Sequence, residues 1–161
     1  KNNTFVFEQY PALPRLYTVG KYTVVDDDET LLRTLFDAPF EPFQEILLEV
    51  DPGFPSATVS AIVHATKIEE QHVEATVEAQ GNVLLVMTDT YYPGWNAYID
   101  GKKVPILRAN YAFRAVPIPP GKHDVQIVYE PLSFKIGIIV SLSSLVFVSL
   151  TYAIRRTAFT M

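Results

Sequence analysis

The sequence contains no cysteine, and its other scarce components limit the chemistry that it can perform. Without a thiol there is no disulfide, no thiolate metal site and no cysteine nucleophile. Basic residues are also few, because 13 Lys and Arg stand against 18 Asp and Glu, a net charge of -5. A nucleic-acid-binding protein needs a basic surface to displace condensed counterions, so nucleic acid is not expected as a partner.

Low-complexity stretches and internal repeats are lacking as well. At 161 residues, with 48% hydrophobic and 19% charged residues, the chain has the composition of one folded domain. The 12 prolines and 7 glycines indicate frequent turns rather than long helices throughout. We therefore expect a compact body built from short elements.

One hydrophobic run near the C-terminus differs from this body. Residues 136–154 hold no charge, and Lys135, Arg155 and Arg156 flank them in a segment that has no acidic residue. A helix of this length extends roughly 28 Å, close to the ~30 Å hydrocarbon core of a bilayer. The run predicts a transmembrane helix over residues 133–156, followed by a short tail at 157–161. A buried helix of a soluble protein is the alternative.

The flanking charges also predict an orientation. The positive-inside rule places Arg155 and Arg156 in the cytoplasm, although Lys135 reduces the asymmetry. Residues 1–132 then form an extracytoplasmic domain, and the C-terminus is cytoplasmic. Because the chain begins with Lys1 rather than Met, we expect either that a targeting signal was removed or that the chain is a piece of a longer polypeptide.

The hydrophobic run carries a stripe of small residues on one helix face. Small side chains allow helix backbones to approach closely, and hydroxyl groups can hydrogen-bond across such a contact. The alternative is that the hydroxyl groups bond their own i−4 carbonyl groups and the face meets lipid. The stripe favours packing against an integral membrane partner. Its members are Gly137, Ser141, Ser144, Val148 and Thr151.

The body has the pattern of a series of short strands. Val73, Ala75 and Val77 alternate with polar residues, which predicts a half-buried strand. Asp100-Gly101 favours a type I′ hairpin turn, and Pro120-Gly121 favours a type II turn. The predicted strands cover residues 16–19, 46–50, 58–66, 71–79, 82–90, 95–99, 102–107, 112–118 and 123–129.

One short helix is predicted within the body. Acidic residues 26–29 precede Thr30 and suit the N-terminus of a helix that ends at Asp37-Ala38-Pro39. Its apolar face would consist of Leu31, Leu32, Leu35 and Phe36. The fold expected is mainly β: an antiparallel, jelly-roll-like β-sandwich with one short helix, followed by a single C-terminal transmembrane helix.

Several short motifs in this chain recur together in one protein family. They are Leu13-Pro14-Arg15-Leu16-Tyr17, Tyr92-Pro93-Gly94-Trp95, Tyr98-Ile99-Asp100-Gly101-Lys102, Asn110-Tyr111-Ala112-Phe113-Arg114 and Pro120-Gly121-Lys122-His123. With the membrane helix that follows, this pattern resembles the C-terminal extracytoplasmic domain of the bacterial YfhO-type membrane protein family.

The resemblance carries implications for location and activity. Proteins of this family span the bacterial cytoplasmic (inner) membrane many times and are similar to lipid-linked-sugar glycosyltransferases. Such enzymes place a catalytic carboxylate in an early extracytoplasmic loop among many membrane helices. The resemblance therefore implies that this chain corresponds to the family's terminal domain, without the catalytic core.

Aromatic side chains gather around the Pro93-Gly94 turn. Sugars bind by stacking their C–H faces on such rings, while carboxylates hydrogen-bond their hydroxyl groups. The alternative is that Trp95 and alternate tyrosines fill the core of the sandwich. The candidate ligand-binding residues for a glycan are Tyr92, Trp95, Tyr98 and Asp89.

Other groups of polar residues give weaker indications of a catalytic or binding site. Asp89 and Asp100 are a conceivable carboxylate pair for glycoside hydrolysis, but Asp100 is needed by the hairpin turn. Arg108 and Arg114 suit an anionic ligand or, equally, acidic partners across a strand pair. The only imidazoles are those of His64, His72 and His123. His64 and His72 flank a short turn and would face each other across a hairpin, but zinc needs a third ligand and an ordered second shell. We therefore assign no catalytic residue, metal or cofactor.

The function that follows is a non-catalytic, single-pass accessory module. It is expected to pack on and stabilise a larger membrane protein complex, for example a respiratory or photosynthetic one. The alternatives are the terminal domain of a YfhO-type glycosyltransferase and a carbohydrate-binding domain.

Overall fold

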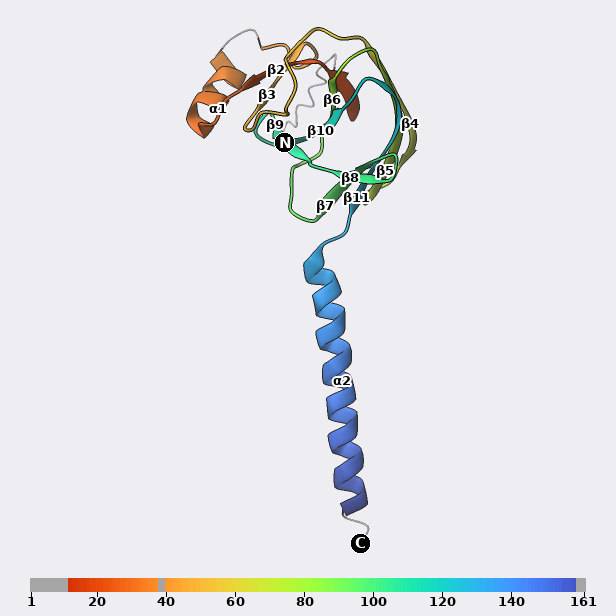
Figure 1. Ribbon diagram of the computed structural model, residues 1–161. Helices are drawn as coiled ribbons and strands as arrows, with labels where there is room; N and C mark the ends of the chain where they lie inside the picture. Colours follow the sequence, from red (N-terminus) through yellow and green to blue (C-terminus); the bar gives the residue numbers. More distant parts are fainter. Residues whose placement is uncertain (1–11, 38–39, 159–161) are drawn as a thin grey trace, which may run out of the picture.

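The computed structural model describes residues 12–37 and 40–158 and contains a two-sheet β-sandwich followed by a long helix (Figure 1). One sheet has the strand order β1-β6-β10-β9-β3-β2, and the other has the order β4-β5-β11-β7-β8. The strands of the first sheet are β1 (Leu16–Val19), β2 (Lys21–Val24), β3 (Glu45–Leu48), β6 (Val83–Met87), β9 (Leu107–Ala109) and β10 (Phe113–Ile118). Those of the second are β4 (Ala61–Ile68), β5 (His72–Ala79), β7 (Trp95–Ile99), β8 (Lys102–Val104) and β11 (Gly121–Tyr129).

The main core lies between the two sheets, as the alternating pattern predicts. Val73, Ala75 and Val77 of β5 are buried, and they belong to the same apolar cluster as Leu85 of β6 and Ile127 of β11. Burying a large aliphatic side chain contributes about 1.5–3 kcal/mol, so this cluster is the main source of stability of the sandwich. The expected β-sandwich is confirmed.

Strand β6 of the first sheet is buried on both faces, which explains its uninterrupted apolar sequence. Leu85 faces the main core, whereas Leu84 and Val86 belong to a second cluster on the opposite face. This second cluster also contains Ile46 of β3, with Phe54 packed against it. A strand covered on both sides has no polar face to present, so alternation disappears.

One strand pair departs from the antiparallel expectation. β2 runs parallel to β3, with Tyr22 opposite Ile46, whereas the other pairs that the structure describes are antiparallel. The connection between these two strands contains α1 (Asp28–Asp37), and a helical crossover is what parallel neighbours require. The sequence pattern did not predict β2 as a strand.

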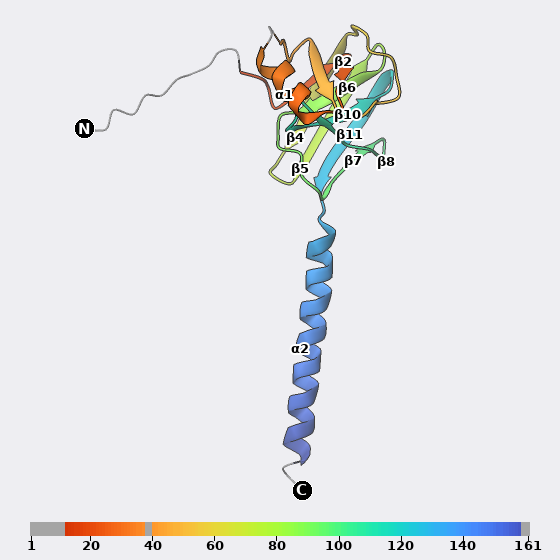
Figure 2. The ribbon, with the colours of Figure 1, turned by 90° about the vertical axis from the view of Figure 1, so that its left-hand side faces the viewer.

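Helix α1 forms where it was expected, but its buried face is narrower. The carboxylate of Asp27 accepts a hydrogen bond from the Thr30 amide at 2.8 Å, which is the N-cap arrangement. Leu31 is completely buried, whereas Phe36 is 82% exposed. The expectation that Phe36 packs inward is wrong, because α1 lies at the edge of the sandwich and only part of its surface meets a neighbour (Figure 2).

The predicted hairpin turn between β7 and β8 is confirmed. Asp100 has φ 50° and Gly101 has φ 76°, the positive values that both central positions of a type I′ turn require. Val125 of β11 pairs with Ile99 on the other edge of β7, so this hairpin is held firmly in the second sheet.

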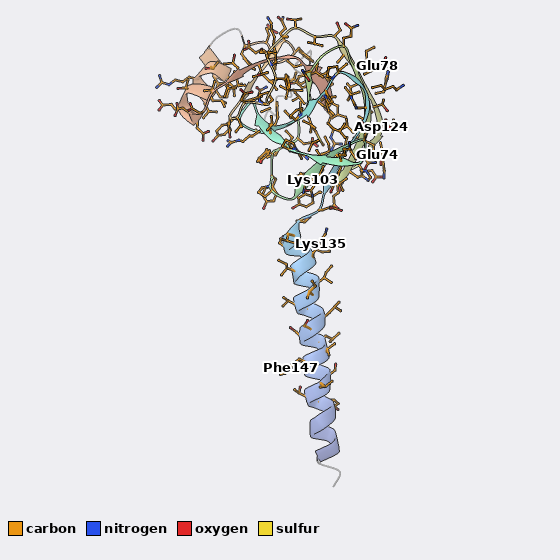
Figure 3. All side chains as sticks on the ribbon, in the orientation of Figure 1. Glu74, Glu78, Lys103, Asp124, Lys135 and Phe147 are labelled. Carbon is orange, nitrogen blue, oxygen red and sulfur yellow. The ribbon has the colours of Figure 1, made fainter. Side chains whose placement is uncertain are left out.

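Helix α2 (Leu132–Ala158) leaves the sandwich at the end of β11 and extends away from it in both views (Figures 1 and 2). Its segment Leu132–Tyr152, 21 residues, is long and apolar enough to span a membrane, and none of it is buried inside the structure. Figure 3 shows Phe147 halfway along this bare helix, with no sandwich residue near it.

Candidate functional site

Asp89 lies at the end of the first sheet that is nearest α2, where two arginines hold it. Arg15, just before β1, places Nη2 2.8 Å from Asp89 Oδ2, with its Nε at 3.1 Å from the same oxygen. Arg114 of β10 places its Nη2 3.3 Å from that oxygen. β1 and β10 pair with opposite edges of β6, so the strand order itself brings both arginines to Asp89.

The guanidinium group of Arg114 also covers an aromatic ring. Its Cζ lies 3.8 Å from the centroid of the Trp95 ring, a cation–π geometry. Tyr129 of β11 packs against the same indole, with ring centroids 5.3 Å apart. Arg114 is only 3% exposed, and this burial lowers its pKa, although the nearby Asp89 opposes the shift. The stack joins the two sheets at the α2 end.

The loop Tyr91–Gly94, which we name the aromatic loop, is fixed to the start of α2. The Glu130 amide donates a hydrogen bond of 2.7 Å to the Gly94 carbonyl oxygen. Gly94 has φ 107°, and a Cβ atom there would meet Tyr129 Cε2 at 2.9 Å and Pro131 Cα at 3.2 Å. Only glycine therefore permits both this backbone conformation and this close approach.

Beside this loop the surface is hollowed into a small pocket of about 300 Å³. Aromatic rings of the loop meet one lysine and one amide side chain there, so the pocket combines apolar walls with a few hydrogen-bonding groups. Its lining consists of Tyr91, Tyr92, Pro93, Gly94, Trp95, Asn96, Lys103, Val104, Pro105 and Ile106. Figure 3 shows Lys103 on the side of the sandwich nearest α2.

The structure brings together only part of the predicted glycan site. Tyr92 and Trp95 line the pocket, whereas Tyr98 and Asp89 do not. Tyr98 lies on the opposite face of β7 from Trp95, because the two residues are three positions apart and side chains alternate between the faces of a strand. Asp89 is engaged by arginines, and Arg114 occupies one face of the indole on which a sugar would stack.

The alternative roles of the other polar residues are also clarified. Arg108 lies over the Tyr111 ring at 4.3 Å and pairs with Glu49 at 3.0 Å, so both Arg108 and Arg114 have acidic partners. Asp100 lies in the turn between β7 and β8, whereas Asp89 lies in the connection from β6 to β7. Each carboxylate has its own partner, His123 for Asp100 and Arg15 for Asp89. His64 lies opposite Thr76, and His72 lies opposite Val128, so these two imidazoles are not cross-strand neighbours.

The small-residue stripe of α2 borders an open groove. The groove has a volume of about 620 Å³ and is lined by Ser133, Phe134, Gly137, Ile138, Ser141 and Leu142. Farther along, the Ser144 hydroxyl donates to the Val140 carbonyl oxygen at 2.8 Å, and Thr151 donates to Val148 at 2.8 Å. The hydroxyl groups of Ser144 and Thr151 are therefore satisfied within the helix and are not free donors to a partner.

The model of the family described as "Bacterial membrane protein YfhO" matches residues 57–141, more than half of the chain. The chain belongs to the YfhO family. The matched residues run from the approach to β4 into the first turns of α2, and they include the aromatic loop, Asp89 and Arg114. The resemblance noted from the sequence motifs is thereby confirmed.

A curated relative supports this membership but extends far beyond the chain. It is the "Uncharacterized protein YfhO" of Bacillus subtilis (strain 168), 40% identical over 55 residues. That alignment covers 34% of this chain and 6% of the relative, so the chain spans a small part of that protein's length. No solved structure matches the chain.

The sequence patterns did not predict the contacts that organise the α2 end of the sandwich. Arg15 and Arg114 both stand within the family motifs, and Arg114 was considered only as an anion ligand or an ion-pair partner. That Trp95 would lie beneath Arg114 was not foreseeable, because they come from different sheets and nothing local links them. Gly94 carried the one available signal, a glycine that follows proline and precedes a strand.

A second polar contact joins two family motifs at the opposite end of the second sheet. His123 Nδ1 lies 2.7 Å from Asp100 Oδ2, and the Asp124 amide donates to Asp100 Oδ1 at 3.0 Å. The hydrogen bond with Asp100 raises the pKa of His123, and the same contact lowers the pKa of Asp100. In this YfhO-type domain the pair links the β7–β8 turn to β11.

Proposed function

We propose that this chain is a non-catalytic, membrane-anchored module of a YfhO-type protein. Helix α2 crosses the bilayer, and the sandwich stands on the extracytoplasmic side and stabilises a larger membrane assembly. The observation that carries the proposal is the fully exposed apolar surface of α2 attached to a well-packed sandwich. Each exposed large side chain costs about 1.5–3 kcal/mol in water, so lipid or other membrane helices must cover this surface.

The proposed contact with neighbouring membrane helices uses the Gly137 face of α2. Gly137 and Ser141 leave the groove that Phe134 and Leu142 border, and another helix backbone can approach closely there. Because Ser144 and Thr151 bond carbonyl groups of their own helix, close packing at Gly137 contributes more to the association than hydrogen bonds from these two hydroxyl groups. The partner helices belong to an integral membrane protein.

A structural role fits the state of the polar residues in the sandwich. Asp89, which precedes the aromatic loop in the chain, is paired with Arg15 and Arg114 and therefore has a structural role. Asp100 has another, in the hairpin turn and the contact with His123. The proposed orientation follows from the charges at the ends of α2, with Arg155-Arg156 on the cytoplasmic side of a bacterial inner membrane.

Two leucine variants of α2 test the proposal. Ser141→Leu fills the groove on the Gly137 face, whereas Ser143→Leu makes the same change about 200° around the helix. Both variants should stay in the membrane after a carbonate wash. Only Ser141→Leu should lose comigration with a larger assembly on a native gel after mild detergent extraction.

Equal comigration of both variants with the assembly would count against the packing face. Migration of the wild-type chain as a free monomer, or its release by carbonate, would overturn the proposed function as a whole.

A second candidate function is suggested by the pocket beside the aromatic loop. Tyr91, Tyr92 and Asn96 could hold part of a glycan there, as the terminal domain of a lipid-linked-sugar glycosyltransferase would require. Arg114 already covers Trp95, which leaves the two tyrosines as the stacking surface. Isothermal titration of the chain with common glycans tests this candidate. An absence of binding heat, or a binding heat that Tyr92→Ala does not reduce, would remove it.

A further inference from the structure

We infer that the aromatic loop and the first turn of α2 form an interfacial anchor that lies in the lipid headgroup layer. The inference rests on the proposed function only in requiring that α2 span the bilayer. The anchor consists of Tyr91, Tyr92, Leu132 and Phe134, and its partner is a lipid surface. It holds the base of the sandwich against the membrane in one orientation.

The first argument is the fixed height of the loop above the helix. The hydrogen bond from the Glu130 amide to the Gly94 carbonyl oxygen joins the loop to a residue just before α2. Gly94 also packs against Pro131, the last residue before the helix begins. The loop therefore cannot move away from the start of α2 without breaking these contacts.

The second argument is the length of the apolar helix. Leu132–Tyr152 comprises 21 residues, which extend about 32 Å, and the hydrocarbon core is ~30 Å thick. Leu132 therefore lies at the edge of the hydrocarbon, and the adjoining interfacial layer is roughly 5–8 Å deep. A loop bonded to Glu130 and packed on Pro131 falls within that layer.

The third argument is the chemistry that this end of the sandwich exposes. Tyr91 is 40% exposed and Tyr92 is 61% exposed, while Leu132 and Phe134 are 69% and 67% exposed. Tyrosine combines an apolar ring with a hydroxyl group and accumulates at membrane interfaces. Residues 90–96 carry no charge, so nothing in the loop opposes its entry into the headgroup layer.

The charged residues at the base of the sandwich indicate that the tyrosine rings enter the interface by partitioning, rather than by electrostatic attraction of the protein to anionic lipid. Lys135 approaches Glu130 at 3.7 Å, and Lys67 pairs with Glu69 at 3.2 Å, so each of these two lysines has an acidic partner that offsets its charge. Figure 3 shows Lys103 and Lys135 near the junction, whereas Glu74 lies on the adjoining face of the second sheet. Contact with the bilayer should therefore persist in neutral lipid and in high salt.

Two spin labels in the full chain test the inference, because the sequence has no native cysteine. Pro93→Cys places a label in the loop, and Lys122→Cys places one at the opposite end of β11. In phosphatidylcholine nanodiscs, the label at position 93 should be more accessible to oxygen and less accessible to a water-soluble nickel chelate. Equal, fully aqueous accessibility at both positions would overturn the inference.

A matched pair of variants identifies the responsible side chains. The double variant Tyr91→Ser/Tyr92→Ser should raise the nickel-chelate accessibility of the label at position 93 toward that of the label at 122. Phe36→Ser removes a still more exposed ring from α1, which lies away from α2, and should leave both labels unchanged. Lipid accessibility that appears only with anionic lipid, or that loss of both tyrosines leaves unchanged, would contradict anchoring by these rings.

The same samples separate this inference from the proposed function. If α2 resists carbonate and the wild-type label at 93 is aqueous, the anchor is absent while the membrane module stands. If the chain leaves the membrane altogether, the proposed function fails, and the anchor fails with it.

Discussion

The guanidinium group of Arg114 lies 3.8 Å from the centre of the Trp95 ring and pairs at the same time with Asp89. This one side chain links β10 of the first sheet to β7 of the second. Because Arg114 is almost completely buried, its charge depends on these two neighbours to offset the loss of hydration.

Replacing Arg114 with alanine should therefore destabilise the sandwich considerably. Loss of the cation–π contact, the ion pair and the buried side-chain volume predicts a decrease of about 2–4 kcal/mol in the free energy of unfolding. Denaturant titration of the detergent-solubilised chain, followed by the emission of the single tryptophan, measures it.

Arg108→Ala is the matched control, because Arg108 also lies over a tyrosine ring and pairs with an acid but is more exposed. Its substitution should cost no more than about 1 kcal/mol. If the two variants lose equal stability, burial is not what makes Arg114 important.

A second prediction concerns the pH dependence of the His123–Asp100 contact. The pKa of His123 is raised in the folded state, so its contribution is fully present below the unfolded value of about 6.5 and is lost as pH rises through the folded pKa. The pKa of Asp100 is lowered, so its contribution is present above about 3.9 and is lost as pH falls through the folded pKa.

The stability advantage of the wild-type chain over His123→Gln should therefore be largest between about pH 4 and 6.5 and decrease toward alkaline pH. Thermal unfolding at several pH values measures this difference. His64→Gln, which alters an exposed imidazole on β4, serves as the matched control. A wild-type advantage over His123→Gln that grows with pH would contradict the assigned charge state.

A third prediction compares two glycines that both have positive φ. Gly101→Ala has nothing within 4 Å of the new Cβ atom and should cost about 1 kcal/mol, the ordinary penalty of a left-handed residue. Gly94→Ala adds a clash with Tyr129 and the backbone of Pro131, so its cost should reach about 2–3 kcal/mol or more.

Hydrogen exchange distinguishes the two glycine variants further. Gly94→Ala should speed exchange at the Glu130 amide, because the loop carbonyl group that it bonds must move. Gly101→Ala should leave that amide protected. Unchanged protection in Gly94→Ala would show that the loop is not tied to the start of α2.

The fourth prediction addresses orientation. If Arg155 and Arg156 are cytoplasmic, protease added outside spheroplasts should cut the sandwich, and protease added to inverted vesicles should not. The reverse pattern would mean that Lys135, rather than the two arginines, faces the cytoplasm. A carbonate wash of the same membranes serves as the control for integration.

Local patterns in the sequence were sufficient for most elements of the fold. The alternation at Val73 and Val77, the continuous apolar run of β6 and the Asp100-Gly101 turn each predict their structure within a few residues. The apolar run after Lys135 predicts α2 for the same reason. Strand boundaries shifted by a few residues, as in β4, because strand ends depend on the neighbour with which they pair. The single strand expected over 102–107 is wrong, because the chain there passes from β8 in the second sheet to β9 in the first.

The candidate site depended far more on tertiary structure. Tyr92 and Trp95 do meet at one pocket, but Tyr98 faces away from it, since alternate residues of a strand point to opposite sides. In the sequence, Asp89 had no assigned partner and was a candidate to bind a ligand. In the structure it pairs with Arg15, just before β1, and with Arg114 of β10, the two strands that flank β6.

The sequence by itself determined the β-rich body, the short capped helix and the apolar segment, because periodicity, turn chemistry and length act over neighbouring residues. Only the tertiary structure decided that β2 runs parallel to β3, that Arg15 reaches Asp89 across 74 positions, and that Gly94 lies against Pro131. These contacts join residues far apart in the chain, and strand order, which no local pattern encodes, selects which of them meet.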